Sequence, residues 1–136
     1  MHLTLEADYA VRIVNCLVNS GKRLDAKSIS EKSCITIRFA LKILGKLAAA
    51  GIVKSFKGTN GGYELNMQPS EIKLRTVIET VEGTYFFSRC LNPDNCCNRV
   101  SDHSCKYQKV FNEISTIVRD KLDEYTFDMF IEDKNN

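Results

Sequence analysis

Residues 36–65 read TIRFALKILGKLAAAGIVKSFKGTNGGYEL, and this stretch decides the fold. In its first half, through Ala50, apolar residues recur every three or four positions, which predicts an amphipathic helix. Thr36 is suited to cap the start of this helix, and Gly51 stands where a helix commonly ends in left-handed backbone. The apolar stripe consists of Phe39, Ile43 and Leu47.

A β-hairpin is predicted directly after this helix. Residues 52–56 and 63–65 have the composition of short strands, and the glycine-rich turn 57–62 joins them. A short hairpin with a basic tip after a long helix is typical of the wing of a winged-helix DNA-binding domain. The helix would read the major groove, and the hairpin tip would reach the backbone or the minor groove.

Two more helices are predicted before this stretch. Residues 4–19 repeat apolar side chains with helical spacing, and a short helix begins at Asp25. The turn around Cys34, which we expect to be buried, then separates two helices as in a helix-turn-helix. The residues expected to contact DNA are Thr36, Arg38, Phe39 and Lys42 in the second helix of the pair and Lys57 and Asn60 in the wing. The alternative is a solvated helix face, with Phe39 in the core, and a polar hairpin tip.

Composition narrows the class of protein. With 136 residues and 43% hydrophobic content, the chain can form one domain with a real core. Residues 1–75 carry a net charge of +6 and residues 76–136 carry −4, which suits a chain that meets phosphate with its first half. The sequence contains no Ser/His/Asp or Cys/His arrangement and no phosphate loop, so nothing in it indicates an enzyme. The sequence lacks a stretch for a membrane span and a signal-peptide pattern, so we expect a cytoplasmic protein.

A second unusual stretch, Cys90–Cys105, reads CLNPDNCCNRVSDHSC and holds four of the six cysteines. Its Asn, Asp, Ser and Pro residues predict a loop rather than a core element. Thiols crowded on a loop are consistent with an iron–sulfur cluster, a zinc ion, a cluster-free thiol switch or disulfides. Cytoplasmic thiols stay reduced, and the gaps are wider than those of zinc knuckles, so a cluster is favoured.

The rest of the chain predicts a dimer. From Tyr107 onward, apolar residues recur in steps of three and four over about five turns. A helix this long in so short a chain favours pairing with a second copy. The fold class is therefore mainly α, a winged helix-turn-helix domain with a small β-hairpin wing and a long C-terminal dimerisation helix. We divide the chain into a DNA-binding domain (1–83), a cysteine-rich loop (84–106) and a dimerisation helix with its tail (107–136).

With these pieces in order, the chain resembles the Rrf2 family of bacterial winged-helix regulators over nearly its whole length. The wing followed by the cysteine loop is the specific part of this resemblance. The segments that carry it are Leu3-Thr4, Tyr9-Ala10-Val11-Arg12, Ile29-Ser30-Glu31, Lys46-Leu47, Gly51-Ile52-Val53, Ser55-Phe56-Lys57-Gly58, Gly61-Gly62-Tyr63, Glu82-Gly83 and Leu122 through Phe130.

The resemblance implies a homodimer with crossed C-terminal helices and an iron–sulfur cluster near the interface, of four-iron or two-iron form. It implies Cys90, Cys96 and Cys105 as ligands, although the gap before Cys105 is longer than usual and Cys97 leaves the middle ligand open. In the cluster-assembly branch of the family a histidine is the fourth ligand, and here that position is Gln108. In the nitric-oxide branch an aspartate from the partner's first helix serves, and Asp8 matches it.

The resemblance also implies a function. The protein would bind a double-stranded DNA operator, most often as a repressor, and its cluster would sense nitric oxide, redox state or cluster supply. Two alternatives stay open at this point. One is a regulator that responds through thiols or an effector without a cluster, and the other is an iron–sulfur or zinc carrier protein. For Asp8 the alternative role is a helix-start carboxylate favoured by the helix dipole.

Overall fold

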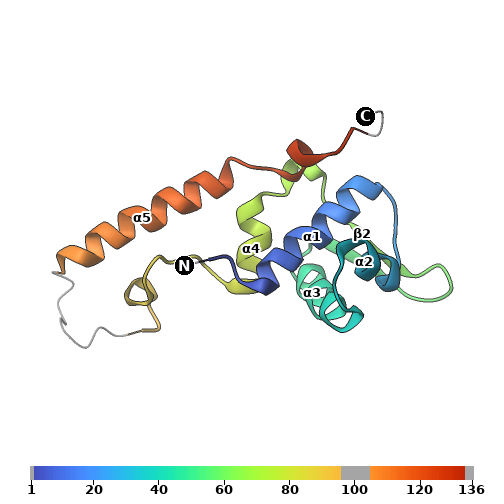
Figure 1. Cartoon of the computed structure of the whole chain (residues 1–136), viewed down its shortest axis with the longest axis horizontal. Coiled ribbons are helices and arrows are strands. Elements are labelled where there is room, and N and C mark those ends of the chain that lie inside the picture. Colours follow the sequence, from blue (N-terminus) through green and yellow to red (C-terminus); the bar gives the residue numbers. More distant parts are fainter. Residues whose placement is uncertain (1, 96–104, 134–136) are drawn as a thin grey trace.

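The structure is a computed structural model that describes residues 2–95 and 105–133. The first three helices and the hairpin form one module, α4 lies against it, and α5 extends away on the far side of α4 (Figure 1). The α-helices and strands are α1 (Leu5–Ser20), α2 (Ala26–Ser33), α3 (Ile37–Ala49), β1 (Val53–Phe56), β2 (Gly62–Leu65), α4 (Leu74–Glu82) and α5 (Lys106–Asp123). Three short 3-10 helices are η1 (Pro69–Glu71), η2 (Arg89–Leu91) and η3 (Phe127–Phe130). The expected mainly helical winged-helix architecture is confirmed.

The starts of the first three helices follow from their capping residues. Thr4 accepts a hydrogen bond from the N–H of Ala7 at 3.1 Å and so caps α1. Asp25 caps α2 through the N–H of Ser28 at 2.7 Å, and Thr36 caps α3. Each side chain satisfies an N–H that has no partner inside the helix.

The core lies between α1, α3 and α4. Their apolar stripes meet there because each helix has one face without charge, and burial of that face drives the packing. Phe39 is not part of this core, since it is 44% exposed. The largest fully buried side chains are Ile13, Leu17, Ile29, Ile43, Leu44, Leu47, Ile52, Ile72 and Phe127.

The wing is an antiparallel pair of strands that is tied to the loop between α1 and α2. Val53 pairs with Leu65 and Phe56 pairs with Gly62. Leu24 exchanges two backbone hydrogen bonds with Tyr63, at 2.9 and 2.8 Å. Gly62 has φ +145°, and a Cβ at this residue would lie 2.5 Å from the carbonyl oxygen of Leu24. The close approach of these two segments therefore requires glycine at this position.

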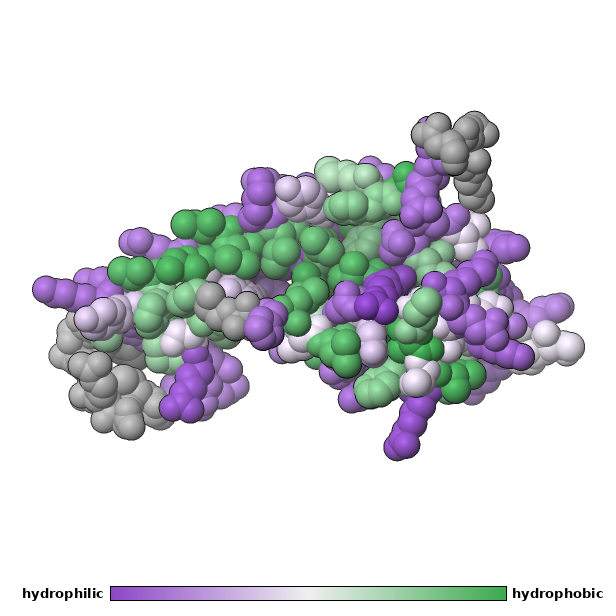
Figure 2. All heavy atoms as spheres, in the orientation of Figure 1, coloured by the Kyte–Doolittle hydropathy of each residue, from purple (hydrophilic) through white to green (hydrophobic). Residues whose placement is uncertain are grey.

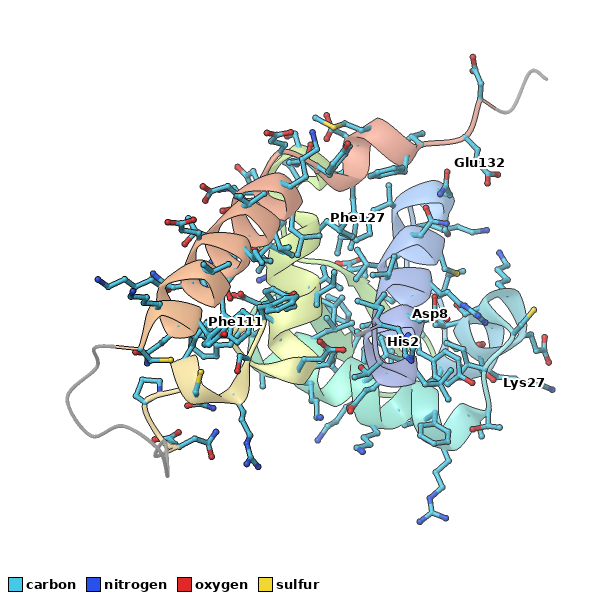
Figure 3. The ribbon with its side chains drawn as sticks, turned by 60° about the vertical axis from the view of Figure 1, so that its left-hand side comes forward. His2, Asp8, Lys27, Phe111, Phe127 and Glu132 are labelled. Atoms are coloured by element: carbon cyan, nitrogen blue, oxygen red, sulfur yellow. The ribbon has the colours of Figure 1, made fainter. Side chains whose placement is uncertain are left out.

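The chain returns to the first module after α5. Phe127 is 2% exposed and belongs to the same core as α1 and α3 (Figure 3). Its N–H donates to the carbonyl of Ile72 at 3.1 Å, and the N–H of Leu74 donates to the carbonyl of Tyr125 at 2.9 Å. The segment after α5 is thus anchored to the module formed by the first three helices and the hairpin, through both its backbone and the Phe127 side chain.

Two further observations concern sequence-based expectations. Cys34 is exposed, and the expectation that it is buried is wrong. It ends α2 in left-handed backbone, with φ +57°, which turns its side chain out of the helix pair. No helix in the described ranges 2–95 and 105–133 is long and apolar enough to cross a membrane.

Candidate DNA-binding face and cysteine site

The turn between α2 and α3 is held from inside by Ser30. Its hydroxyl is buried and donates to the carbonyl of Ile35 at 2.6 Å, while the N–H of Ile35 donates to the carbonyl of Ser30 at 3.0 Å. This pair of bonds closes the turn in which Cys34 takes its left-handed conformation. It sets the angle at which α3 leaves α2. The sequence offered little signal for this role, because a serine within a short helix is usually exposed.

The expected contact residues of α3 share one surface. Thr36, Arg38 and Lys42 are exposed together with Phe39 at the start of the helix. Arg38, Phe39 and Lys42 line a single hollow of about 520 Å³. The rings of Phe39 and Tyr9 pack in a T-shaped arrangement, with centroids 5.9 Å apart, so that the Phe39 ring is held on the surface without being buried. The geometry gives α3 an exposed end with two cations and an apolar ring between them.

The expected contact residues of the wing lie at its tip. Lys57 and Asn60 are both exposed. Arg23, from the loop after α1, lies with its guanidinium 3.3 Å from the centroid of the Phe56 ring and donates to the carbonyl of Asn60 at 3.1 Å. It also approaches Glu64 at 3.6 Å. Arg23 therefore braces the hairpin, a role that sequence analysis did not find because the residues it joins are far apart in the chain.

Acidic side chains hold only some of the cations on this face. Lys46 lies 2.6 Å from Glu6, and this contact holds the pKa of Glu6 below its usual range. Lys42 is 3.9 Å from the same carboxylate and its side chain is 58% exposed. Within residues 2–95 and 105–133, no carboxylate pairs with Arg38 or Lys57. Their charges are therefore available to an outside anion such as phosphate.

Two of the expected cluster ligands lie beside the first turn of α5. Cys90 belongs to η2, which packs against α5, and Cys105 is the residue that precedes α5 as its N-cap. Both thiols are half-buried. Gln108, one turn into α5, donates to the carbonyl of Cys90 at 3.4 Å, and the Ser88 hydroxyl lies 3.2 Å from the Cys90 sulfur. Cys96 and Cys97 lie outside the described residues.

Asp8 is on α1, far from this end of α5. Figure 3 shows Asp8 and Phe111 on opposite sides of α4. The carboxylate of Asp8 pairs with Arg12 at 2.8 Å through Oδ2, and its side chain is 41% exposed. In the described part of the chain, no group of three or more His, Cys, Asp or Glu side chains could hold a metal ion. One protomer therefore does not bring Asp8 to Cys90 or Cys105, and the expected fourth ligand stays a prediction about the dimer.

A family model described as Rrf2, iron-dependent transcriptional regulator, matches residues 3–133. The chain belongs to the Rrf2 family. Relatives within it include the HTH-type transcriptional regulator NsrR of Bacillus licheniformis, 30% identical over 93% of this chain and 89% of that protein. The NsrR of Bacillus subtilis is 27% identical over 100% of this chain and 94% of that protein. These relatives are regulators and not enzymes, as expected from the sequence.

Solved structures confirm the fold. The structure matches that of T. potens IscR with a TM-score of 0.71 at 22% identity, covering 93% of this chain and 83% of that one. It matches CymR, titled the global cysteine regulator of B. subtilis, with a TM-score of 0.75 at 22% identity over 94% of each chain. The oxidized form of Staphylococcus aureus CymR matches with a TM-score of 0.73 at 24% identity over 98% of each chain.

The side chains at this site are of the chemical type that binds an iron–sulfur cluster. Cys90 and Cys105 are half-buried thiols from two segments that pack together, and thiolate is the usual protein ligand of such clusters. The N-terminus of α5, where Cys105 lies, has a helix dipole that favours a negatively charged group. Gln108, at the position of the histidine of the cluster-assembly branch, donates its amide nitrogen to the backbone carbonyl of Cys90.

Proposed function

We propose that this Rrf2 regulator is a homodimeric repressor that binds a double-stranded DNA operator through α3 and the wing. The support is the exposed cluster of Arg38, Phe39 and Lys42 around one hollow, with Lys57 on the adjoining wing. The cations contact phosphates and fix the register of the protein, whereas Arg38 has the geometry to bond a guanine edge. Thr36 accepts the N–H of Phe39 and keeps its own hydroxyl hydrogen for a phosphate oxygen.

The proposed dimer forms through α5. Ser115 faces its own chain and is fully buried, and Phe111 packs against Phe87 with ring centroids 5.3 Å apart. A neighbouring strip of the helix carries apolar side chains that the protomer leaves exposed. Figure 2 shows the apolar band that runs along α5. The exposed apolar members of the strip are Tyr107, Val110 and Ile117.

The proposed regulatory site joins the two protomers. Cys90, Cys96 and Cys105 would hold an iron–sulfur cluster of four-iron or two-iron form, with Asp8 of the partner subunit as fourth ligand. The observation that carries this proposal is the placement of the Cys90 and Cys105 segments side by side at the start of α5, with Gln108 bonded to Cys90. When bound, such a cluster supplies iron that reacts with nitric oxide or oxidants.

A chain of two contacts connects Asp8 to the recognition helix. Arg12 pairs with Asp8 through one guanidinium nitrogen and donates through another to the carbonyl of Ser33 at 3.4 Å. Ser33 is the last residue of α2, immediately before the turn into α3. A change in what Asp8 binds therefore alters the hold of Arg12 on this turn. Operators with two half-sites require a set angle between the two modules, so a coupling of about 1–3 kcal/mol is enough to change occupancy.

Anaerobic purification tests this proposal. The wild-type protein should show absorption at roughly 300–450 nm from cluster charge transfer, and Cys90→Ala should lose it. Cys34→Ser is the matched control, because Cys34 is exposed and lies in the helix-turn-helix rather than beside α5. Operator DNA selected from random sequences then reports whether loss of the colour changes affinity. A colourless, iron-free wild-type protein would rule out the cluster but leave DNA binding in place.

A thiol switch without a cluster is the second candidate. The exposed thiol of Cys34 lies at the turn between α2 and α3, on the side of the molecule proposed to meet DNA. Oxidation there would add bulk at the turn and weaken binding. The test is operator affinity of the cluster-free protein before and after treatment with hydrogen peroxide. A loss of affinity that Cys34→Ser abolishes favours this candidate.

A further inference from the structure

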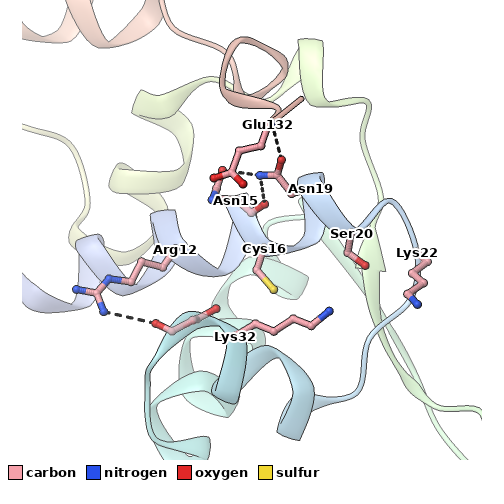
Figure 4. A pocket seen from close by; sticks show the side chains of 9 residues that line it. Arg12, Asn15, Cys16, Asn19, Ser20, Lys22, Lys32 and Glu132 are labelled. Carbon is pink, nitrogen blue, oxygen red and sulfur yellow. Dashed lines mark hydrogen bonds between the residues drawn. The ribbon is translucent and has the colours of Figure 1, made fainter. Parts of the chain in front are cut away.

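A polar cavity of about 540 Å³ lies between α1, α2 and the end of the C-terminal segment (Figure 4). It is separate from the α3 face, the wing tip and the Cys90 segment, although Arg12 and Ser33 in its lining also connect Asp8 to the turn after α2. Cys16 on α1 and Lys32 on α2 face it from opposite walls. Glu132 closes one end, where its N–H donates to Asn19 Oδ1 at 2.8 Å.

The cavity is lined by hydroxyl and amide groups. Ser33 is 5% exposed and lines the cavity, where its hydroxyl interacts with the Cys16 thiol. The Ser20 hydroxyl also belongs to the lining. The Asn15 and Asn19 amides, bonded to each other at 2.9 Å, supply further polar atoms on the α1 wall.

The charge of the walls indicates the sign of the charge on a fitting ligand. Arg12, Lys22 and Lys32 line the cavity against one carboxylate, that of Glu132. Arg12 is already paired with Asp8, whereas Lys22 and Lys32 pair with no acid in residues 2–95 and 105–133. Two cations without partners match a ligand with carboxylate or phosphate oxygens.

We propose that this cavity binds a small organic anion that carries carboxylate or phosphate groups. Its volume is in the range of sites for small metabolites. The ligand would contact Lys32 on α2, Arg12 on α1 and the segment that follows α5. It would thus connect the helix pair that presents α3 to the segment that anchors α5, and it would share Arg12 with Asp8. This site makes the regulator responsive to a metabolite as well as to the group held by its cysteines.

Calorimetric titration of the DNA-free protein with citrate and with inorganic phosphate tests the site. Saturable binding is expected for at least one of them. Lys32→Gln should weaken it about tenfold or more, as expected for loss of one charged hydrogen-bond partner. Lys27→Gln is the matched control, because Lys27 is an exposed lysine on the same helix that does not line the cavity. Absence of saturable binding, or binding that loses no more in Lys32→Gln than in Lys27→Gln, overturns the proposal.

Alkylation of Cys16 gives a second readout. Burial raises the pKa of the Cys16 thiol, partly opposed by Ser33 and Lys32, so N-ethylmaleimide labelling is followed at mildly alkaline pH by peptide mass spectrometry. The bound anion should slow labelling of Cys16 and leave labelling of the exposed Cys34 unchanged in the same sample. Equal rates at Cys16 with and without a saturating anion place the anion elsewhere and overturn the proposal. Both tests omit DNA, so their failure does not bear on operator binding.

Discussion

Replacing Ile117 with Asp should dissociate the proposed dimer without unfolding the protomer. Ile117 is 67% exposed in the protomer, so its side chain contributes little to the fold of its own chain. Leu122, which belongs to the same apolar repeat of α5, is half-buried and lines a cavity with Phe86 and Phe87 of its own chain. A change at Leu122 would therefore damage the protomer as well as any dimer.

The magnitude follows from the exposure of Ile117. Full burial of an isoleucine contributes about 1.5–3 kcal/mol, and about two thirds of this residue remains to be covered, which gives about 1–2 kcal/mol per side chain. A twofold interface contains the residue twice, so the loss is about 2–4 kcal/mol. At 1.4 kcal/mol for each factor of ten, the dimer dissociation constant should rise roughly 30- to 700-fold. The buried Asp carboxylate adds to this cost.

Sedimentation velocity across a concentration series measures the dissociation constant, and circular dichroism checks that the variant keeps its helices. Thr116→Asp is the control, because it adds the same charge to the neighbouring position on the polar side of α5 with Asn112 and Glu113. If Ile117→Asp and Thr116→Asp dissociate alike, or if neither does, α5 does not form the interface through this strip.

Three further predictions concern DNA binding and the regulatory site. Lys57→Ala should reduce the magnitude of the slope of log affinity against log salt concentration by about 0.9, because one phosphate contact is lost. An unchanged slope in binding assays would place the wing away from DNA. Gly62→Ala should weaken operator binding and increase hydrogen exchange in the wing while the helices stay intact, since its Cβ would lie 2.5 Å from the Leu24 carbonyl oxygen. Asp8→Ala should retain a cluster of shorter lifetime with an altered DNA response, whereas Cys90→Ala should abolish the cluster. If Asp8→Ala keeps the wild-type absorption spectrum, cluster lifetime and DNA response, Asp8 is only a helix-start charge.

Local interactions explain what the sequence predicted well. The caps at Thr4, Asp25 and Thr36 join residues three positions apart, and the glycines of the wing permit a tight turn. Such contacts depend on neighbours in the chain, and the helical spacing of apolar residues depends only on the geometry of a helix. These signals, with the order of helix, hairpin and cysteine loop, were sufficient for the fold and for the family.

The sequence was sufficient to predict which types of residue form the candidate site, whereas it did not predict the residues that they contact. The exposed cations Arg38 and Lys57 could be selected from charge and position alone. Whether Phe39 was core or surface depended on Tyr9, which lies thirty residues earlier in the chain and packs against its ring in a T-shaped arrangement. An apolar residue at helical spacing indicates that it packs against something, but the sequence does not say what covers it.

By itself, then, the sequence determined the elements, their order and the chemistry that the cysteine stretch can support. The tertiary structure decided the long-range matters: Arg23 as the brace of the wing, Phe127 in the core, Cys34 on the surface and Ser33 in a polar cavity. It also decided which side of α5 is covered by its own chain and which side is left exposed. These features arise where segments distant in sequence pack together, and the free energy of such packing depends on all the segments at once rather than on any local pattern.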